Sequence, residues 1–186
     1  MARTPKKLAH GYLTTSLAVL YTVPASTRTQ ITEVWIANTD AGLSKDITLT
    51  VGDSTLAKNA IASAVTVNNA DTVVLSDCKI TLTASETFGG RINTNTTGTA
   101  TGGASASITL STASSTIDDY YNNSIIELTN NSPNGVLGLS KIITDYTGSS
   151  KVAIVDSNWA TLPVSAATTY IIGPTYVTLF GIEEGI

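Results

Sequence analysis

The chain has 186 residues, of which 42% are hydrophobic and only 13% are charged, and its net charge at pH 7 is −4. This length allows one large domain or two small ones, each with a buried core. The acidic balance disfavours nucleic-acid binding, and the single cysteine and single histidine exclude a disulfide framework and a zinc site built on these residue types.

The first ten residues are basic and polar, and they contain a cluster of positive charges formed by Arg3, Lys6 and Lys7. This composition is typical of an arm rather than of a core element. Such an arm either lies ordered across a neighbouring subunit or is flexible. The apolar stretch at residues 17–23 is short, so we interpret it as a β-strand and not as a signal sequence. No apolar run approaches about 18 residues, and we expect no insertion into a membrane.

Alternating apolar and polar residues predict further strands in the first half of the chain. The clearest covers residues 28–38, where Ile31 and Trp35 are expected on one face and Val34 and Ile36 on the other. Because both faces carry apolar side chains, we expect a central strand. It is either covered on both sides or has one face in a subunit interface.

Weaker patterns follow as far as residue 92. Residues 45–51 read as a strand, and shorter strands are expected at 65–67, 72–75 and 79–82. Residues 56–64 fit a short helix or an extended connection equally well. The pair Gly89-Gly90 indicates a bulge or a close approach of two backbones.

A change of composition marks the middle of the chain. Residues 93–106 are rich in Gly, Thr and Asn, which is typical of a linker or a domain boundary. A second set of strands follows, including a hairpin formed by residues 136–144 and 151–155. The closing strand at 176–183 comes after a second boundary at Gly173-Pro174, and we expect it to return to the first sheet.

These patterns together predict an all-β protein. A β-sandwich or jelly-roll-like domain is expected to hold a second small β domain inserted before its last strand. The expected organisation is an N-terminal arm at 1–10, a sandwich domain at 11–98 plus 175–186, and an inserted β domain at 99–174.

No residue pattern points to catalysis or to a bound cofactor. The only histidine, His10, lies in the expected arm, and the sequence lacks a nucleophile elbow, a phosphate-binding loop and a carboxylate pair of defined spacing. We therefore predict a non-enzymatic protein without a metal or cofactor, and we read the pair Asp118-Asp119 as a solvated turn. The rings of Tyr120, Tyr121 and Trp159 have two interpretations: they either stack on a glycan or another partner, or form the core of the inserted domain.

Several runs resemble a group of small β-structured virion proteins of tailed bacteriophages. In that group a V-P-A turn, here residues 23–25, precedes a strand that ends in A-N-T, here 37–39. A T-L-x-V-G strand follows at 48–52, and the closing V-x-x-x-G-I-E-E lies at 177–184. Residues 108–155 resemble a second phage module, with DDYYN, IITDY and KVA runs and Trp159 after them. Where the group typically has Gly after V-P-A, this chain has Ser26.

The resemblance implies a virion structural protein on the particle surface. The first interpretation is a capsid decoration or cement protein that assembles with itself, as a trimer or another symmetric oligomer, and with the major capsid protein. In that role Arg3, Lys6 and Lys7 would contact acidic capsid surface. The alternative is a tail, neck or fibre component whose inserted domain binds host glycan through the aromatic rings.

Overall fold

The computed structural model describes residues 5–52, 60–131 and 138–185. All regular secondary structure in these ranges is β-strand, in sixteen strands, and the described residues contain no helix. The prediction of an all-β protein is therefore confirmed. The chain divides into two compact units: unit 1 comprises residues 1–38, 44–94 and 175–186, and unit 2 comprises 39–43 and 95–174.

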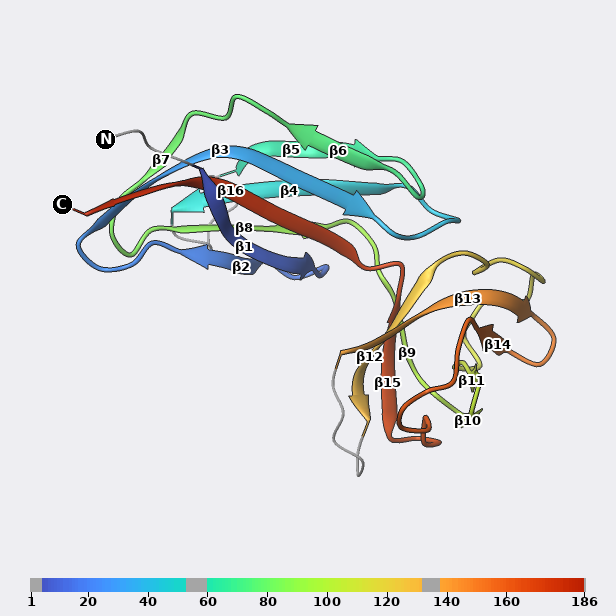
Figure 1. Ribbon diagram of the computed structural model, residues 1–186. Helices are drawn as coiled ribbons and strands as arrows, with labels where there is room; N and C mark the ends of the chain where they lie inside the picture. Colours follow the sequence, from blue (N-terminus) through green and yellow to red (C-terminus); the bar gives the residue numbers. More distant parts are fainter. Residues whose placement is uncertain (1–4, 53–59, 132–137, 186) are drawn as a thin grey trace. The chain divides into compact units, whose positions relative to one another are not determined.

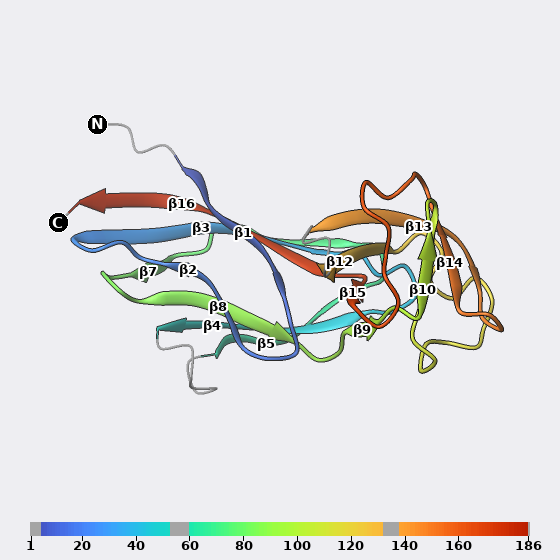
Figure 2. The ribbon, with the colours of Figure 1, turned by 90° about the horizontal axis from the view of Figure 1, so that it is seen from below.

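Unit 1 is a sandwich of two antiparallel sheets. Sheet A has the order β1-β16-β3-β6, with β7 also paired to β3, and sheet B has the order β2-β8-β4-β5. Figure 2 shows the two sheets as separate layers. The strands are β1 (Lys6–Leu13), β2 (Ala18–Thr22), β3 (Thr27–Asn38), β4 (Lys45–Gly52), β5 (Ala60–Val67), β6 (Thr72–Leu75), β7 (Ile80–Leu82), β8 (Thr87–Ile92) and β16 (Thr175–Gly185).

The core of unit 1 lies between the two sheets and follows from the period-2 alternation of their strands. Ile47 and Leu49 of β4, and Val177 and Leu179 of β16, stand at alternate positions and point inward. The buried members are Leu13, Tyr21, Val23, Ile31, Val34, Ile36, Ile47, Leu49, Val67, Leu82, Phe88, Ile92, Val177 and Leu179.

A β-bulge in β3 changes the alternation that the sequence predicts. The pairing of β16 with β3 steps from Phe180–Glu33 to Gly181–Ile31, so Thr32 is the extra residue. A bulge of this kind shifts the inward-facing positions by one residue. Ile31 is consequently buried with the core, whereas Trp35, expected on the same face, is 44% exposed on the opposite side of the sheet.

Strand β8 runs unusually close to both of its neighbours. A side-chain carbon at Gly90 would lie 2.7 Å from the Thr48 carbonyl oxygen of β4, and one at Gly89 would collide with the Ala18 carbonyl of β2. The close backbone approach expected at this glycine pair is therefore confirmed, and only glycine fits both positions.

The N-terminal arm expected at 1–10 is corrected for residues 6–10, which belong to β1; residues 1–4 lie outside the described residues. Residues 6–13 form an edge strand that pairs antiparallel with β16, from Lys6 opposite Gly181 to Leu13 opposite Thr175. Figure 1 shows β1 alongside β16. The basic and polar composition was misleading because an edge strand with one solvated face needs few apolar residues: Leu8 and Ala9 pack on the core.

Unit 2 contains a path of seven antiparallel strands in the order β10-β11-β14-β13-β12-β15-β9. The segment 93–106 contains the boundary between the two units, as one of its two interpretations had it. The linker interpretation is corrected, because the segment supplies β9 and β10 as strands of this path; β9 pairs with β15 and β10 with β11. The strands are β9 (Thr96–Thr99), β10 (Gly102–Ala104), β11 (Ser107–Thr109), β12 (Ile125–Asn131), β13 (Leu139–Thr147), β14 (Val152–Val155) and β15 (Thr168–Ile172).

The loop between β3 and β4 belongs to unit 2 although both of its strands belong to unit 1. The Ile125 amide donates to the Thr39 carbonyl (3.3 Å), and the Ala41 amide donates to Ser124 Oγ (3.0 Å). Gly173 has φ +63°, and a side chain there would collide with Asp40, so this position requires glycine.

The first boundary between the units lies between residues 94 and 95, whereas the sequence suggested 98 and 99. The second boundary lies between 174 and 175, as the sequence suggested.

Residues 60–64, part of the undecided segment at 56–64, belong to β5, and residues 53–59 lie outside the described residues. Ser26, which stands where the resembling group has glycine, adopts φ 53°, a conformation that favours glycine.

Candidate interaction surface

A polar network ties the start of β1 to both sheets of unit 1. Lys6 Nζ lies 2.6 Å from Glu183 Oε2 on β16, and the Tyr21 hydroxyl of β2 donates to Glu183 Oε1 at 2.6 Å. The same hydroxyl lies 2.9 Å from Oγ1 of the buried Thr29 on β3. Lys6, expected to contact a capsid, therefore has an internal partner.

This network shifts two pKa values in opposite directions. Hydrogen bonds from Lys6 and then Tyr21 lower the pKa of Glu183 below its ordinary value of 4.5. Burial, reinforced by the bonded carboxylate, raises the pKa of Tyr21 to about 12. At neutral pH the network thus joins an ammonium, a carboxylate and a neutral phenol.

The lowered pKa of Glu183 predicts acid sensitivity of unit 1. Its stabilisation is fully present above the unfolded-state pKa and is lost as pH falls through the folded-state pKa. We expect Glu183→Gln to lower the free energy of unfolding by about 1 kcal/mol at pH 7, because the ion pair is largely solvent-accessible. In urea unfolding from pH 7 to pH 3, the difference from the wild-type protein should shrink toward the acid end.

A matched control for that experiment is Asp77→Asn. The Asp77 side chain is exposed and has no ion pair or hydrogen bond within the described part of the chain. This variant should follow the pH profile of the wild-type protein. A Glu183→Gln difference that is constant with pH would contradict the assigned network.

The other residues of the expected arm have different environments. Lys7 is exposed, and its side chain makes no ion pair or hydrogen bond with the described residues. His10 Nδ1 lies 2.8 Å from Thr178 Oγ1, and its ring stacks on Tyr176 at 5.5 Å and 9°. Arg3 lies outside the described residues.

Of the two interpretations of the aromatic side chains in unit 2, the structure supports a core role for Tyr121 and Trp159 and not a glycan or partner contact. Tyr121 and Trp159 are each only 5% exposed, and both belong to the buried cluster of the unit. Tyr121 packs edge-on against Tyr120 and Tyr146, with ring centroids 5.0 and 4.8 Å apart. Only Tyr120 is half-buried. A buried ring offers no face for stacking on a sugar.

Two phenols of this cluster are anchored on the segment that precedes β12. The Tyr121 hydroxyl accepts from the Ser115 amide at 3.0 Å, and the Tyr146 hydroxyl donates to the Ser115 carbonyl at 2.6 Å. Burial, with the neighbouring Tyr121, raises the pKa of Tyr146 to about 12. These contacts use the polar ends of the rings internally.

The carboxylates of Asp118 and Asp119 stabilise turns. Asp118 Oδ1 accepts from the Gly148 amide at 2.7 Å, and Asp119 Oδ1 accepts from the Asn122 side chain at 2.7 Å. Among the described residues, no group of three or more His, Cys, Asp or Glu is placed to hold a metal ion.

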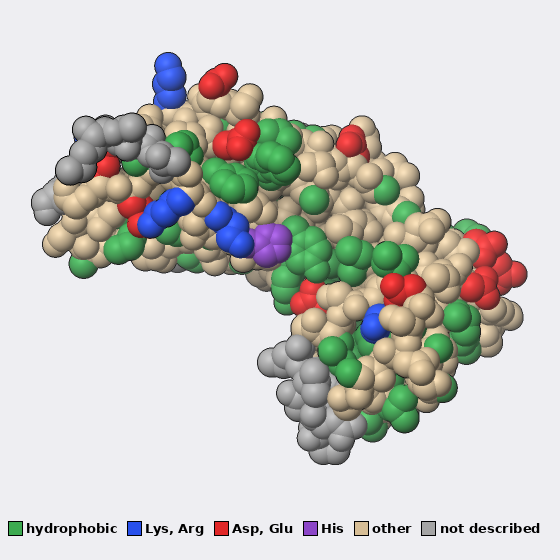
Figure 3. All heavy atoms as spheres, in the orientation of Figure 1, with side chains coloured by type: hydrophobic (Ala, Val, Ile, Leu, Met, Phe, Trp, Pro, Cys, Tyr) green, Lys and Arg blue, Asp and Glu red, His purple; other side chains and the backbone are tan. Residues whose placement is uncertain are grey.

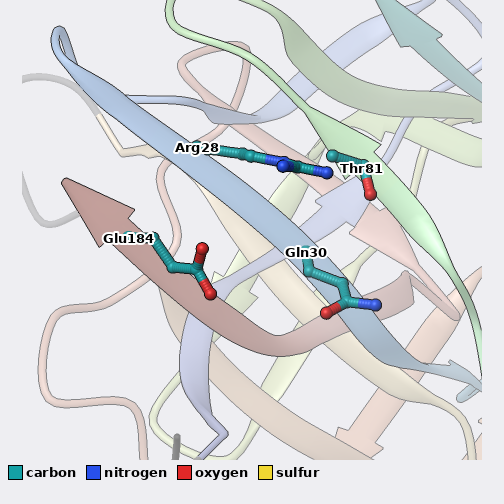
Figure 4. A pocket seen from close by; sticks show the side chains of 4 residues that line it. All are labelled: Arg28, Gln30, Thr81 and Glu184. Carbon is teal, nitrogen blue, oxygen red and sulfur yellow. The ribbon is translucent and has the colours of Figure 1, made fainter. Parts of the chain in front are cut away.

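A shallow hollow lies on sheet A near the C-terminal end of β16 (Figure 4). Arg28 and Gln30 enter it from β3, Thr81 from β7 and Glu184 from β16. Its volume is about 100 Å³, which is below the roughly 300–1,000 Å³ of small-molecule sites. Size and polarity make it part of a surface rather than a ligand pocket.

The outer face of sheet A, which is turned away from the core, carries side chains in three rows across β1, β16 and β3. Figure 3 shows hydrophobic side chains gathered there beside the histidine, with basic side chains to one side. The rows follow the strand register: Lys7, Phe180 and Glu33; His10, Thr178 and Trp35; Tyr12, Tyr176 and Ala37.

Ring contacts join these rows into one surface. Tyr12 meets Tyr176 edge-on with centroids 6.4 Å apart, and Trp35 lies 5.9 Å from Phe180. Val74 of β6, paired with Trp35, extends the surface and is 44% exposed, as is Trp35. Large exposed apolar surfaces mark sites of protein interaction.

Sequence reasoning identified part of this surface and missed the rest. The open alternative that one face of the 28–38 strand lies in a subunit interface covers Trp35 and Ala37. The contribution of β1 was missed because residues 1–10 were interpreted as an arm. The alternation of His10 and Tyr12 was the available signal.

Comparison with protein family models, curated proteins and solved structures finds no match to this chain. Within the described ranges, no helix has the length and apolar character needed to cross a membrane.

Proposed function

We propose that this chain is a non-enzymatic structural protein of a bacteriophage particle, which decorates or cements the capsid as a trimer or another symmetric oligomer. The observation that carries the proposal is the outer face of sheet A, where the exposed Trp35 and the half-buried rings of Tyr12, Tyr176 and Phe180 lie on three adjacent strands. An extended flat surface of this kind suits contact with another protein better than capture of a small molecule.

The attribution to a phage particle rests on the resembling runs, and their positions in the fold support it. Val23 of the V-P-A run is buried where β2 leads into a turn, and the A-N-T run closes β3. Asn38 is buried, and its amide donates to the Asn68 carbonyl at 3.0 Å. These motif residues build the scaffold, as expected for a structural protein.

The buried rings of unit 2 favour decoration over the glycan-binding alternative. A fibre or tail component that binds host glycan through Tyr121 or Trp159 would need these rings at the surface. Each is 5% exposed. The proposed function therefore assigns unit 2 no glycan site at these rings.

Immunogold electron microscopy of intact particles tests the proposal. The particles would come from the phage whose genome encodes the chain, and the antibody would be raised against the whole protein. We expect gold spread evenly over the heads, and a copy number by quantitative mass spectrometry comparable with that of the major capsid protein. Gold confined to the neck or tail, or a few copies per particle, would overturn the decoration role.

A further inference from the structure

The outer face of sheet A has a distribution of charge and size that is complementary to itself. In the first row, Lys7 on β1 and Glu33 on β3 flank Phe180 on β16. Neither charged side chain has an ion pair or hydrogen bond within the described residues. In this row, the side of β16 toward β1 is therefore basic and the side toward β3 is acidic, with an aromatic ring between them.

In the other two rows, too, the side chain on β1 differs from the side chain on β3. In the second row His10 on β1 stands across from Trp35 on β3, and in the third row the large Tyr12 stands across from the small Ala37. Each row thus pairs two unlike side chains, one on either side of β16.

A twofold axis parallel to the strands and lying over β16 would place the unlike side chains of each row opposite one another in two copies. Such an axis exchanges the two sides of β16 and leaves the position along the strands unchanged, so each row meets the same row of a second copy. Lys7 then opposes Glu33 of the second copy, His10 opposes Trp35, and Tyr12 opposes Ala37. The contact is isologous, and each pairing occurs twice.

The size of the face suits a stable contact of this type. Strand β3 has 12 residues, which corresponds to about 40 Å of length, and sheet A is three to four strands wide at about 4.8 Å per strand. The face therefore covers on the order of 700 Å² per copy, close to the roughly 800 Å² that each partner contributes to a standard interface. Two sheets packed in this way lie about 10 Å apart, the thickness of a layer of interdigitated side chains.

We propose that a second copy of this chain covers the outer face of sheet A, in a twofold dimer with reciprocal Lys7–Glu33 pairs around an aromatic centre. Three flat faces around a threefold axis would meet only along their edges, so complete burial of this face requires a dimer. The inference deepens the proposed function, of which self-assembly is a part. It also assigns Lys7 to the contact between copies rather than to a capsid contact.

Light scattering coupled to size-exclusion chromatography of the full chain tests the dimer. We expect a molar mass of twice 19.2 kDa for the wild-type protein at about 10–100 µM. Trp35→Asp should give a monomer with an unchanged far-UV circular dichroism spectrum, because Trp35 lies outside the core. A wild-type monomer or trimer would overturn the twofold assignment, whatever the location of the protein on particles.

A charge-exchange experiment tests the register of the contact. Lys7→Glu and Glu33→Lys should each weaken the dimer by about tenfold or more, because each places like charges opposite one another twice. A mixture of the two single variants should dimerise again, since one copy then supplies carboxylates at both positions and the other supplies ammonium groups at both. Arg91→Glu is the matched control: it reverses an exposed charge on β8 of sheet B and should leave the dimer intact. Failure of the mixture to dimerise would overturn the Lys7–Glu33 pairing.

Discussion

Replacing Trp159 or Tyr121 by alanine is expected to destabilise unit 2 by about 3–5 kcal/mol, because each change removes a large buried ring and leaves a cavity. Each ring is 5% exposed, and Tyr121 also contacts two other rings of the cluster. A loss of this size is a large fraction of the stability of a small β domain. The unit should therefore be largely unfolded in both variants at 37 °C.

The variant Trp159→Phe separates the contribution of ring packing to stability from that of the indole N–H. The buried indole Nε1–H of Trp159 has no acceptor within the described residues. Phenylalanine keeps most of the apolar volume and removes this donor, so we expect a change of about 1 kcal/mol or less. The order of stability should be wild type close to Trp159→Phe, with both far above Trp159→Ala.

Urea unfolding, monitored by hydrogen exchange of the β12 and β13 peptides, measures these effects in unit 2 itself. Ile117→Ser is the control, because this side chain is 63% exposed and its loss should change stability by about 0.5 kcal/mol at most. Alanine variants that stay fully folded would show that the rings are not the core. In that case these aromatic residues would again be candidates for a binding surface.

Deleting residues 2–10 is expected to destabilise unit 1 by about 3 kcal/mol or more. The deletion removes most of β1 and with it the pairing to β16, the Lys6–Glu183 ion pair and the packing of Leu8. Several backbone hydrogen bonds and a partly buried apolar side chain are lost together, and β16 becomes an uncovered edge. A flexible arm would give no such loss.

The single variant Lys6→Ala is the matched control for the deletion. It removes the ion pair with Glu183 and keeps the backbone of β1, so we expect a loss of about 1 kcal/mol. Hydrogen exchange of the β16 peptide should accelerate strongly in the deletion variant and only slightly in the control. Equal protection of β16 in both would contradict the role of β1 as a strand of sheet A.

Local sequence pattern predicted most strands that alternate regularly. Ile47 and Leu49, and Val177 and Leu179 of the closing run, occupy inward positions as their spacing indicates, and the glycine pair in β8 lies where backbones approach closely. These features are local, because the period of a strand and the size of a glycine are properties of a few neighbouring residues. They were sufficient to establish an all-β fold.

The features that sequence alone missed depend on partners far along the chain. Residues 6–13 become a strand only because β16, more than 160 positions later, supplies the backbone groups that pair with them. Residues 96–104 become strands because β15 and β11 pair with them, and the bulge at Thr32 moves Ile31 into the core through its register with β16.

The same distinction holds for the candidate sites. The sequence by itself determined which side chains are aromatic, charged or small, but each ring could serve equally well in a core or on a surface. Tertiary packing decided between these roles: it buried Trp159 and Tyr121 in unit 2 and exposed Trp35 beside Phe180 on sheet A. Burial depends on which elements come together in space, and that pairing is a long-range property that local spacing does not encode.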